Sequence, residues 1–168
     1  MKKIIAFFLI LLGLIFVACG KESGIGEFID KEKISSEYNI EKEDENSIKF
    51  KDKDENSEVY RIFSIEKMLK VDYNNPNKLD KLEEFYLNHD WKTLYKDEET
   101  LMVSHEEADT QGYEYNIHTF DNSKAELAII VSVGATRKVS EAELVNMLKE
   151  AKSFIKKKYN KIFFGRES

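Results

Sequence analysis

The sequence predicts an α+β domain in which an antiparallel sheet of about five or six strands packs against two amphipathic helices. Three observations predict this class. Short segments of alternating apolar and polar residues recur along the chain, as in half-buried strands. Two segments repeat apolar residues every three or four positions, as in amphipathic helices. Most of the strand segments follow one another across short turns, which favours antiparallel pairing.

The chain begins with the pattern of a secretory signal peptide. Lys2 and Lys3 precede an uncharged apolar run over residues 4–18. A helix of this length spans about 22 Å, which is short of the hydrocarbon core of about 30 Å. A buried core helix is excluded as well, because apolar residues on every side would need complete burial within a small, polar chain. We therefore expect residues 1–18 to be a signal peptide that is removed.

The end of this run resembles the lipobox of bacterial lipoproteins, which usually reads Leu-[Ala/Ser]-[Gly/Ala]-Cys. Here the residues are Phe16-Val17-Ala18-Cys19, and Phe16 departs from the usual Leu. The resemblance implies that Cys19 is lipidated on sulfur, that the leader is cut before it, and that the new N-terminus is acylated. It therefore implies a protein anchored to a membrane on the extracytoplasmic side. Gly20 in place of Asp allows the outer membrane, if the cell has two membranes.

Composition limits how else the protein can reach a membrane. The chain has 32 acidic and 26 basic residues and a net charge of −6. Loss of Lys2 and Lys3 with the leader makes this −8. Such a chain has no general attraction to nucleic acid or to anionic headgroups, so we expect attachment through the lipid on Cys19 and no nucleic-acid partner. Cys19 is the only cysteine, so no intramolecular disulfide can form.

Residues 19–46 read as the lipidated cysteine followed by a disordered, charged tether. Apolar residues are sparse, and residues 41–46 are almost wholly charged. Such a segment buries too little apolar surface to offset its ordering entropy. One alternative stays open, in which the few apolar residues dock on the domain or form a short helix. These are Phe28, Ile29, Ile34 and Tyr38.

Residues 47–164 are expected to form one α+β domain. A hairpin is predicted over residues 47–65, with a short helical piece at 66–70; the alternative is a helix over 58–70. The breaker Asn74-Asn75-Pro76 precedes a helix over 77–88. Strands are then predicted from Trp91 and over 100–105, 112–120 and 125–133. The last of these is apolar on both faces, which indicates a central strand covered on both sides.

The final element is an amphipathic helix that starts at a capping box, Ser140-Glu141-Ala142-Glu143. Its apolar stripe runs from Leu144 to Tyr159, and Lys156, Lys157 and Lys158 near its end complement the helix dipole. The order of hairpin, helix, three or four antiparallel strands and helix is similar to that of the Mog1/PsbP-like sandwich. This resemblance concerns element order alone.

No motif points to a reaction. His105-Glu106 begins like a zincin motif, but the fifth position is Asp109, and a zincin needs a second histidine there. The other histidines, His89 and His118, are too far apart in sequence for a metal-site spacing. The chain also lacks a Gly-x-Ser-x-Gly elbow and a phosphate-binding glycine loop. We therefore predict no catalytic, cofactor-binding or metal-binding residues, with lipidation of Cys19 as the one assigned modification.

Aromatic residues are the remaining candidates for recognition. Those in the middle of the chain are Tyr86, Trp91, Tyr95, Tyr113, Tyr115 and Phe120. They predict either an aromatic core or a groove for an apolar ligand, a sugar or a partner protein. The sequence thus indicates a lipid-anchored envelope protein with a non-enzymatic binding or structural role. The alternatives are a small-ligand-binding module, an accessory subunit of an envelope complex, or a hydrolase. If His105, His118 and the carboxylates of residues 106–109 met in one cleft, the non-enzymatic interpretation would be contradicted.

Overall fold

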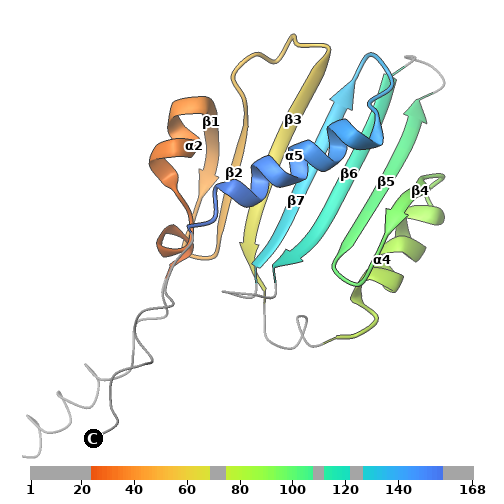
Figure 1. Ribbon diagram of the computed structural model, residues 1–168, viewed down its shortest axis with the longest axis horizontal. Coiled ribbons are helices and arrows are strands. Elements are labelled where there is room, and N and C mark those ends of the chain that lie inside the picture. The colour runs from red at the N-terminus through yellow and green to blue at the C-terminus, as the bar shows by residue number, and fades with distance from the viewer. Residues whose placement is uncertain (1–23, 69–74, 108–111, 122–126, 157–168) are drawn as a thin grey trace, which may run out of the picture.

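The computed structural model describes residues 24–68, 75–107, 112–121 and 127–156 (Figure 1). These residues form one antiparallel sheet in the order β1-β2-β3-β7-β6-β5-β4. The strands are β1 (Tyr38–Glu43), β2 (Ser47–Asp52), β3 (Val59–Lys67), β4 (Lys92–Lys96), β5 (Thr100–Glu107), β6 (Gly112–Asp121) and β7 (Leu127–Ala135). The helices are η1 (Ile25–Glu27), α2 (Lys31–Glu37), α4 (Lys78–Leu87) and α5 (Glu141–Ser153). The predicted α+β class is confirmed.

The sheet has seven strands rather than five or six, because the segment expected to be a tether is folded from Gly24 onward. Residues 24–46 form η1, α2 and β1, so the prediction of disorder is wrong for them. The apolar residues in this segment are few, but Ile25, Ile29 and Ile34 are almost completely buried against the sheet. Packing against the sheet therefore stabilises this segment, although its own composition predicts too little apolar burial for folding. Residues 1–23, which include the leader and Cys19, lie outside the described residues.

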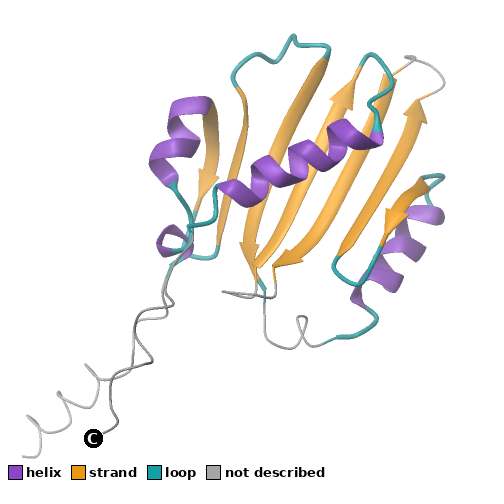
Figure 2. Cartoon of the chain, viewed as in Figure 1, coloured by secondary structure: helices purple, strands orange, loops and turns teal. Residues whose placement is uncertain are grey.

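Helices cover the two faces of the sheet unequally, as Figure 2 shows. Helix α5 runs over β6, β7 and β3 on one face and ends beside β2 (Figure 1). Helix α4 lies on the opposite face beside β4 and β5, where Leu79 and Tyr86 pack on Leu101, Val103 and Phe120. No described helix is both long enough and apolar enough to cross a bilayer.

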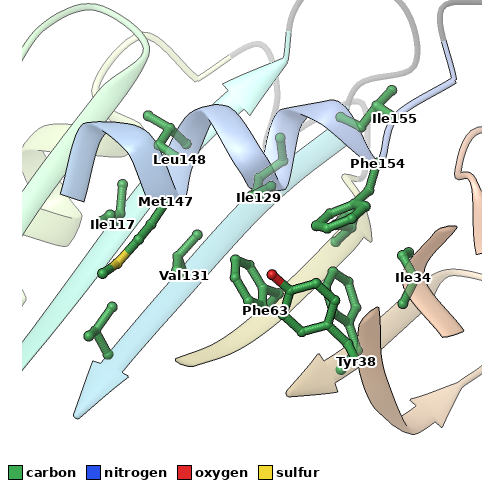
Figure 3. Packing of buried hydrophobic residues seen from close by; sticks show 14 of the residues in the cluster. Ile34, Tyr38, Phe63, Ile117, Ile129, Val131, Met147, Leu148, Phe154 and Ile155 are labelled. Atoms are coloured by element: carbon green, nitrogen blue, oxygen red, sulfur yellow. The ribbon is translucent and has the colours of Figure 1, made fainter. Parts of the chain in front are cut away.

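The main core lies between α5, α2 and the sheet (Figure 3). Four aromatic rings form its centre at the β1–β3 end. The Phe50 and Phe63 rings stack with centroids 5.0 Å apart, and the rings of Tyr38 and Phe154 meet them edge-on. Each fully buried side chain of this size contributes about 1.5–3 kcal/mol relative to an exposed one. The packing fixes the end of α5 over the folded N-terminal segment.

Strand β7 is central, as expected, but it is fully covered on one face only. On the α5 side, Val131 lies between Phe63 of β3 and Ile117 of β6, and all three are buried. On the other side Ile130 and Ser132 are half-buried and Gly134 is exposed. The expected cover of both faces is therefore only partly found, because the second face is half-buried and open at Gly134. The apolar sequence does not reveal that α4 packs at the β4–β5 end of that face.

Several predicted boundaries shift. Strand β3 continues through Lys67, so the helix over 58–70 is not formed and the helical piece at 66–70 does not begin as expected; residues 69–70 lie outside the described residues. Helix α5 has the predicted capping box but ends at Ser153, which leaves Lys156 beyond it. The predicted continuation to Tyr159, with Lys157 and Lys158, lies outside the described residues.

Candidate functional site

The best candidate site is a hollow of about 530 Å³ beside the N-terminal end of α5, which we call the front pocket. Its walls come from the start of β4, the end of β5, the start of β6 and the loop that leads into α5. The side chains that define its chemistry are Asp90, Lys92, Ser104, His105, Glu106, Tyr113, Lys138 and Glu141. This volume falls within the range of small-molecule sites, about 300–1,000 Å³.

The front pocket collects charges of both signs that are not neutralised by ion pairs. Three carboxylates (Asp90, Glu106, Glu141) and two ammonium groups (Lys92, Lys138) border it. Within the described part of the chain none of these five groups forms an ion pair, and Lys138 Nζ instead lies 5.7 Å from the ring centroid of Tyr113. The pocket therefore offers both hydrogen-bond donors and acceptors to a charged ligand.

The hollow exists because β4 is shorter than its neighbour. Lys92 at the start of β4 pairs with Ser104, so His105 and Glu106 of β5 extend past the end of that pairing. Adjacent residues in a strand point to opposite faces. Because β5 has no β4 neighbour beyond Ser104, side chains from both of its faces can reach the pocket there. This explains how His105 and Glu106 come to line one hollow.

An unusual backbone conformation places Asp90 at the rim. Helix α4 ends at Leu87, and the Trp91 amide returns to donate a hydrogen bond of 3.1 Å to the Tyr86 carbonyl. Asp90 adopts a φ of 64°, the only positive φ among the described non-glycine residues. This is the left-handed position after a helix, where glycine is usual and most other residues are strained.

The opposite wall is fixed by a buried contact. The amide of Val139 donates a hydrogen bond of 2.9 Å to the Tyr115 hydroxyl, which holds the loop between β7 and α5 against β6. Helix α5 then starts at the capping box, in which Ser140 Oγ accepts from the Glu143 amide at 3.3 Å. These contacts hold Lys138 and Glu141 on either side of a fixed turn.

The three histidines each touch one aromatic cluster but do not meet one another. The His105 ring stacks on Trp91 at 5.5 Å, the His118 ring lies 5.5 Å from Tyr86, and the His89 ring lies 4.4 Å from Phe85. In the register of β5 and β6, His118 pairs with Leu101 and His105 with Glu114, so the two histidines lie four positions apart along the strands. The described residues contain no group of three side chains able to hold a metal ion.

Burial perturbs one of these histidines. His118 lies beneath α4, and burial lowers its pKa to about 4. Its Nε2 is 2.7 Å from the Tyr86 hydroxyl, whose own pKa is raised by burial. This pair lies inside the smaller core rather than in the front pocket, so its perturbed protonation reflects packing.

The aromatic residues singled out in the sequence are divided between the two faces. Tyr86, Trp91 and Phe120 belong to the α4 side, whereas Tyr113 and Tyr115 face the α5 side. They therefore do not form a single groove. Of the residues in the zincin-like segment, His105 and Glu106 line the front pocket, and Asp109 lies outside the described residues. No pattern in the sequence pointed to Lys92 or Lys138, and Glu141 was noted only as part of the capping box.

A second, shallower hollow lies on the less covered face of the sheet, with a volume of about 290 Å³. Tyr60, Ile62 and Trp91 border it, and its polar groups include Asn116 and Ser132. Ser132 Oγ already donates a hydrogen bond of 2.7 Å to Asn116 Oδ1. Since these polar groups satisfy each other, this hollow offers less to a ligand than the front pocket does.

Comparison with family models, with curated proteins and with solved structures finds no match for this chain. The similarity of element order to the Mog1/PsbP-like sandwich stays a prediction.

Proposed function

We propose that this chain is a lipid-anchored extracytoplasmic envelope protein that acts by binding, and that the front pocket holds a small ligand carrying charges of both signs. The observation that carries the binding role is a set of carboxylates and ammonium groups around one hollow that form no ion pair with any described residue. Charges left without partners on a folded surface are available to a ligand of complementary charge.

Two observations support the lipid anchor: the leader itself, and the short distance in sequence between Cys19 and the described fold. Cys19 follows an apolar run of signal-peptide length and is the only cysteine. The described fold begins at Gly24, five residues later. A chain of five residues spans at most about 18 Å when fully extended, so the lipid would hold the domain close to the bilayer.

Binding is favoured over catalysis by the arrangement of reactive groups. The two histidines of the candidate set are separated, because His118 lies under α4 whereas His105 and Glu106 border the front pocket. No described serine or threonine is hydrogen-bonded to a histidine in the manner of an activated nucleophile.

A partner-binding role is the second candidate, and one observation favours it. Phe85 and Leu87 on α4 are 55% and 53% exposed, although both are large apolar side chains. A partner protein that covered these side chains would remove apolar surface from water, which drives association. An accessory subunit of an envelope complex would use this helix rather than the front pocket.

The anchor is tested by replacing Cys19 with Ala in the producing cell. We expect the wild-type protein to sediment with membranes and to carry the mass of a diacylglyceryl group and an N-acyl chain. The variant should lack this mass. An unmodified wild-type Cys19 would overturn the anchor.

The pocket is tested by calorimetric titration with zwitterionic dipeptides and with derivatives blocked at either end. We expect binding of the zwitterions and weaker binding of the blocked forms. Lys92→Ala and Glu106→Ala should each weaken binding by about tenfold or more, because a hydrogen bond to a charged group is worth about 1.5–3 kcal/mol. Lys81→Ala on exposed α4 is the matched control. Absence of binding, or equal binding by all variants, would contradict this role for the pocket.

A further inference from the structure

The floor of the front pocket is built from strand residues that stand in rows across the sheet. Lys92 of β4 pairs with Ser104 of β5, and Ser104 pairs with Tyr115 of β6. Paired residues of antiparallel strands present their side chains on the same face, so these three form one row, which we call the middle row. Glu106 pairs with Tyr113 two residues further along β5, which gives an outer row about 7 Å away on the same face.

The wall formed by the loop into α5 follows the same order as the rows. Lys138 Nζ lies 5.7 Å from the ring centroid of Tyr113, which belongs to the outer row. The Val139 amide donates to the Tyr115 hydroxyl, which belongs to the middle row. The outer row therefore has the carboxylate of Glu106 on its floor and the ammonium group of Lys138 on its wall, one charge of each sign.

Glu141 stands at the other end of the pocket. It is the first residue of α5, and its side chain is exposed and forms no ion pair with a described residue. The pKa of Tyr95 is raised mainly by its hydrogen bond to Asp97, and the charge of Glu141 also raises it. Glu141 therefore lies near Tyr95, which pairs with Met102 in a third row, inward from the middle row. The carboxylates of residues 106 and 141 thus belong to opposite ends of the pocket.

Apolar surface lies between these two ends. Leu94 lines the pocket between the middle and inner rows, where the pairing of β4 with β5 shifts by one residue. It is 43% exposed, although it is a large apolar side chain. Val139 borders the pocket on the facing wall. An aliphatic stem that ends in a charged group can cover such a surface and keep its charge at the far end.

The charges of the lining indicate the sign of that far group. Three carboxylates and two ammonium groups border the pocket, which gives a formal charge of −1 when His105 is counted as neutral. The nearby Arg137 does not offset this excess, because its guanidinium pairs with Glu143 at 2.7 Å and with Glu58 at 3.7 Å. A ligand with one group of each sign leaves the excess in place, whereas a ligand with one more positive charge compensates it.

We propose that the ligand of the front pocket is a basic amino acid or a short peptide that begins with one, and that Glu141 binds its side-chain cation. This inference rests on the proposed binding of a zwitterion in the front pocket. The α-ammonium group pairs with Glu106, and the carboxylate pairs with Lys92 or Lys138. The aliphatic stem of lysine or arginine then lies along Leu94 and carries its cation to Glu141.

The experiment compares two ligands that differ only in the side-chain cation. Calorimetric titration of the full-length protein in detergent measures the dissociation constants of lysyl-alanine and norleucyl-alanine, whose side chains have the same carbon chain. Glutamyl-alanine is the third probe. We expect lysyl-alanine to bind about fivefold more tightly than norleucyl-alanine, which is the effect of an ion pair on an accessible surface. Glutamyl-alanine should bind more weakly than both.

Glu141→Gln tests the residue that we assign to the cation. Glutamine keeps the size of the side chain and removes its charge, so the ratio of the two dissociation constants should fall close to one. Glu84→Gln, an exposed position on α4, is the matched control and should keep the wild-type ratio. The ratio compares two ligands on the same protein, so an unfolded fraction in either variant does not change it.

The outcomes separate this inference from the proposed function. If norleucyl-alanine binds and lysyl-alanine binds no better, the zwitterion site stands and the preference for a basic ligand falls. A preference for lysyl-alanine that persists in Glu141→Gln would also overturn the inference, as would tighter binding of glutamyl-alanine. If none of the three dipeptides binds, the proposed function of the pocket falls as well.

Discussion

The Tyr86 hydroxyl of α4 lies 2.7 Å from Nε2 of His118 on β6, and this contact closes the smaller of the two cores. The imidazole is neutral there, since burial lowers its pKa from 6.5 to about 4. In the unfolded chain the same ring has its ordinary pKa. Protons therefore bind the unfolded state preferentially between these two values.

The free energy of unfolding should consequently fall as pH drops from about 6.5 to about 4, by about 3 kcal/mol from this group alone. Above pH 6.5 the contribution is constant, because the ring is neutral in both states. His118→Gln keeps a neutral hydrogen-bonding group and should show a shallower pH dependence in urea unfolding. His89→Gln, on an exposed ring, is the control. Equal slopes for wild type and His118→Gln would contradict the assignment.

Asp90 offers a test of strain at the rim of the front pocket. Its φ of 64° suits glycine better than any residue with a side chain. Asp90→Gly should therefore stabilise the protein by about 0.5–1 kcal/mol, and Asp90→Ala should not. Chemical denaturation measures both. If the glycine variant were less stable, the Asp90 side chain would stabilise the fold by more free energy than the strained φ of this residue removes.

Arg61 links two strands to α5. Its guanidinium contacts Asp52 at 2.7 Å and Glu150 at 2.5 Å, and all three side chains are largely shielded. Glu150 also accepts a hydrogen bond from the Tyr38 hydroxyl, and burial, together with that bond, raises the Tyr38 pKa. Arg61→Met leaves two carboxylates without their partner and should cost about 2–3 kcal/mol.

The additional change Asp52→Asn should recover part of that loss, because it removes one of the unpaired charges. A double-mutant cycle in urea unfolding gives the coupling between the two residues. Additive losses would show that Asp52 and Arg61 do not act as a pair.

Ile34 tests whether the N-terminal segment belongs to the fold. This side chain is fully buried in the main core. Ile34→Ala should lower the free energy of unfolding by about 2–5 kcal/mol. Ser35→Ala, on the exposed side of the same helix, should change it little. If the two variants were equally stable, residues 24–46 would not be part of the cooperative unit.

How much of the fold could be predicted depended on how local each signal was. The capping box at Ser140 and the breaker before α4 act within a few residues, and both helices start where the sequence predicts. The N-terminal segment was misjudged because its burial depends on α5 and β2, which lie elsewhere in the chain. The same holds for β7, whose second face is covered or open according to where α4 packs.

The front pocket was beyond prediction for a related reason. Glu106 was noted for an incomplete zinc motif and among the carboxylates of the enzyme alternative, and Lys138 had no distinguishing pattern. They line one hollow because β6 pairs with both β5 and β7, and because β4 stops short of the end of β5. Strand order and strand length are set by long-range pairing, which short-range periodicity does not specify.

By itself the sequence determined the α+β class, the starts of the two long helices and the chemical character of the leader, because these depend on residues close together in the chain. Only the tertiary structure decided that residues 24–46 belong to the fold, that the front pocket collects its charged side chains, and that Ile29 lies beside Ile155. Each of these is a contact between distant segments, whose stability comes from apolar burial and backbone pairing that no single segment provides.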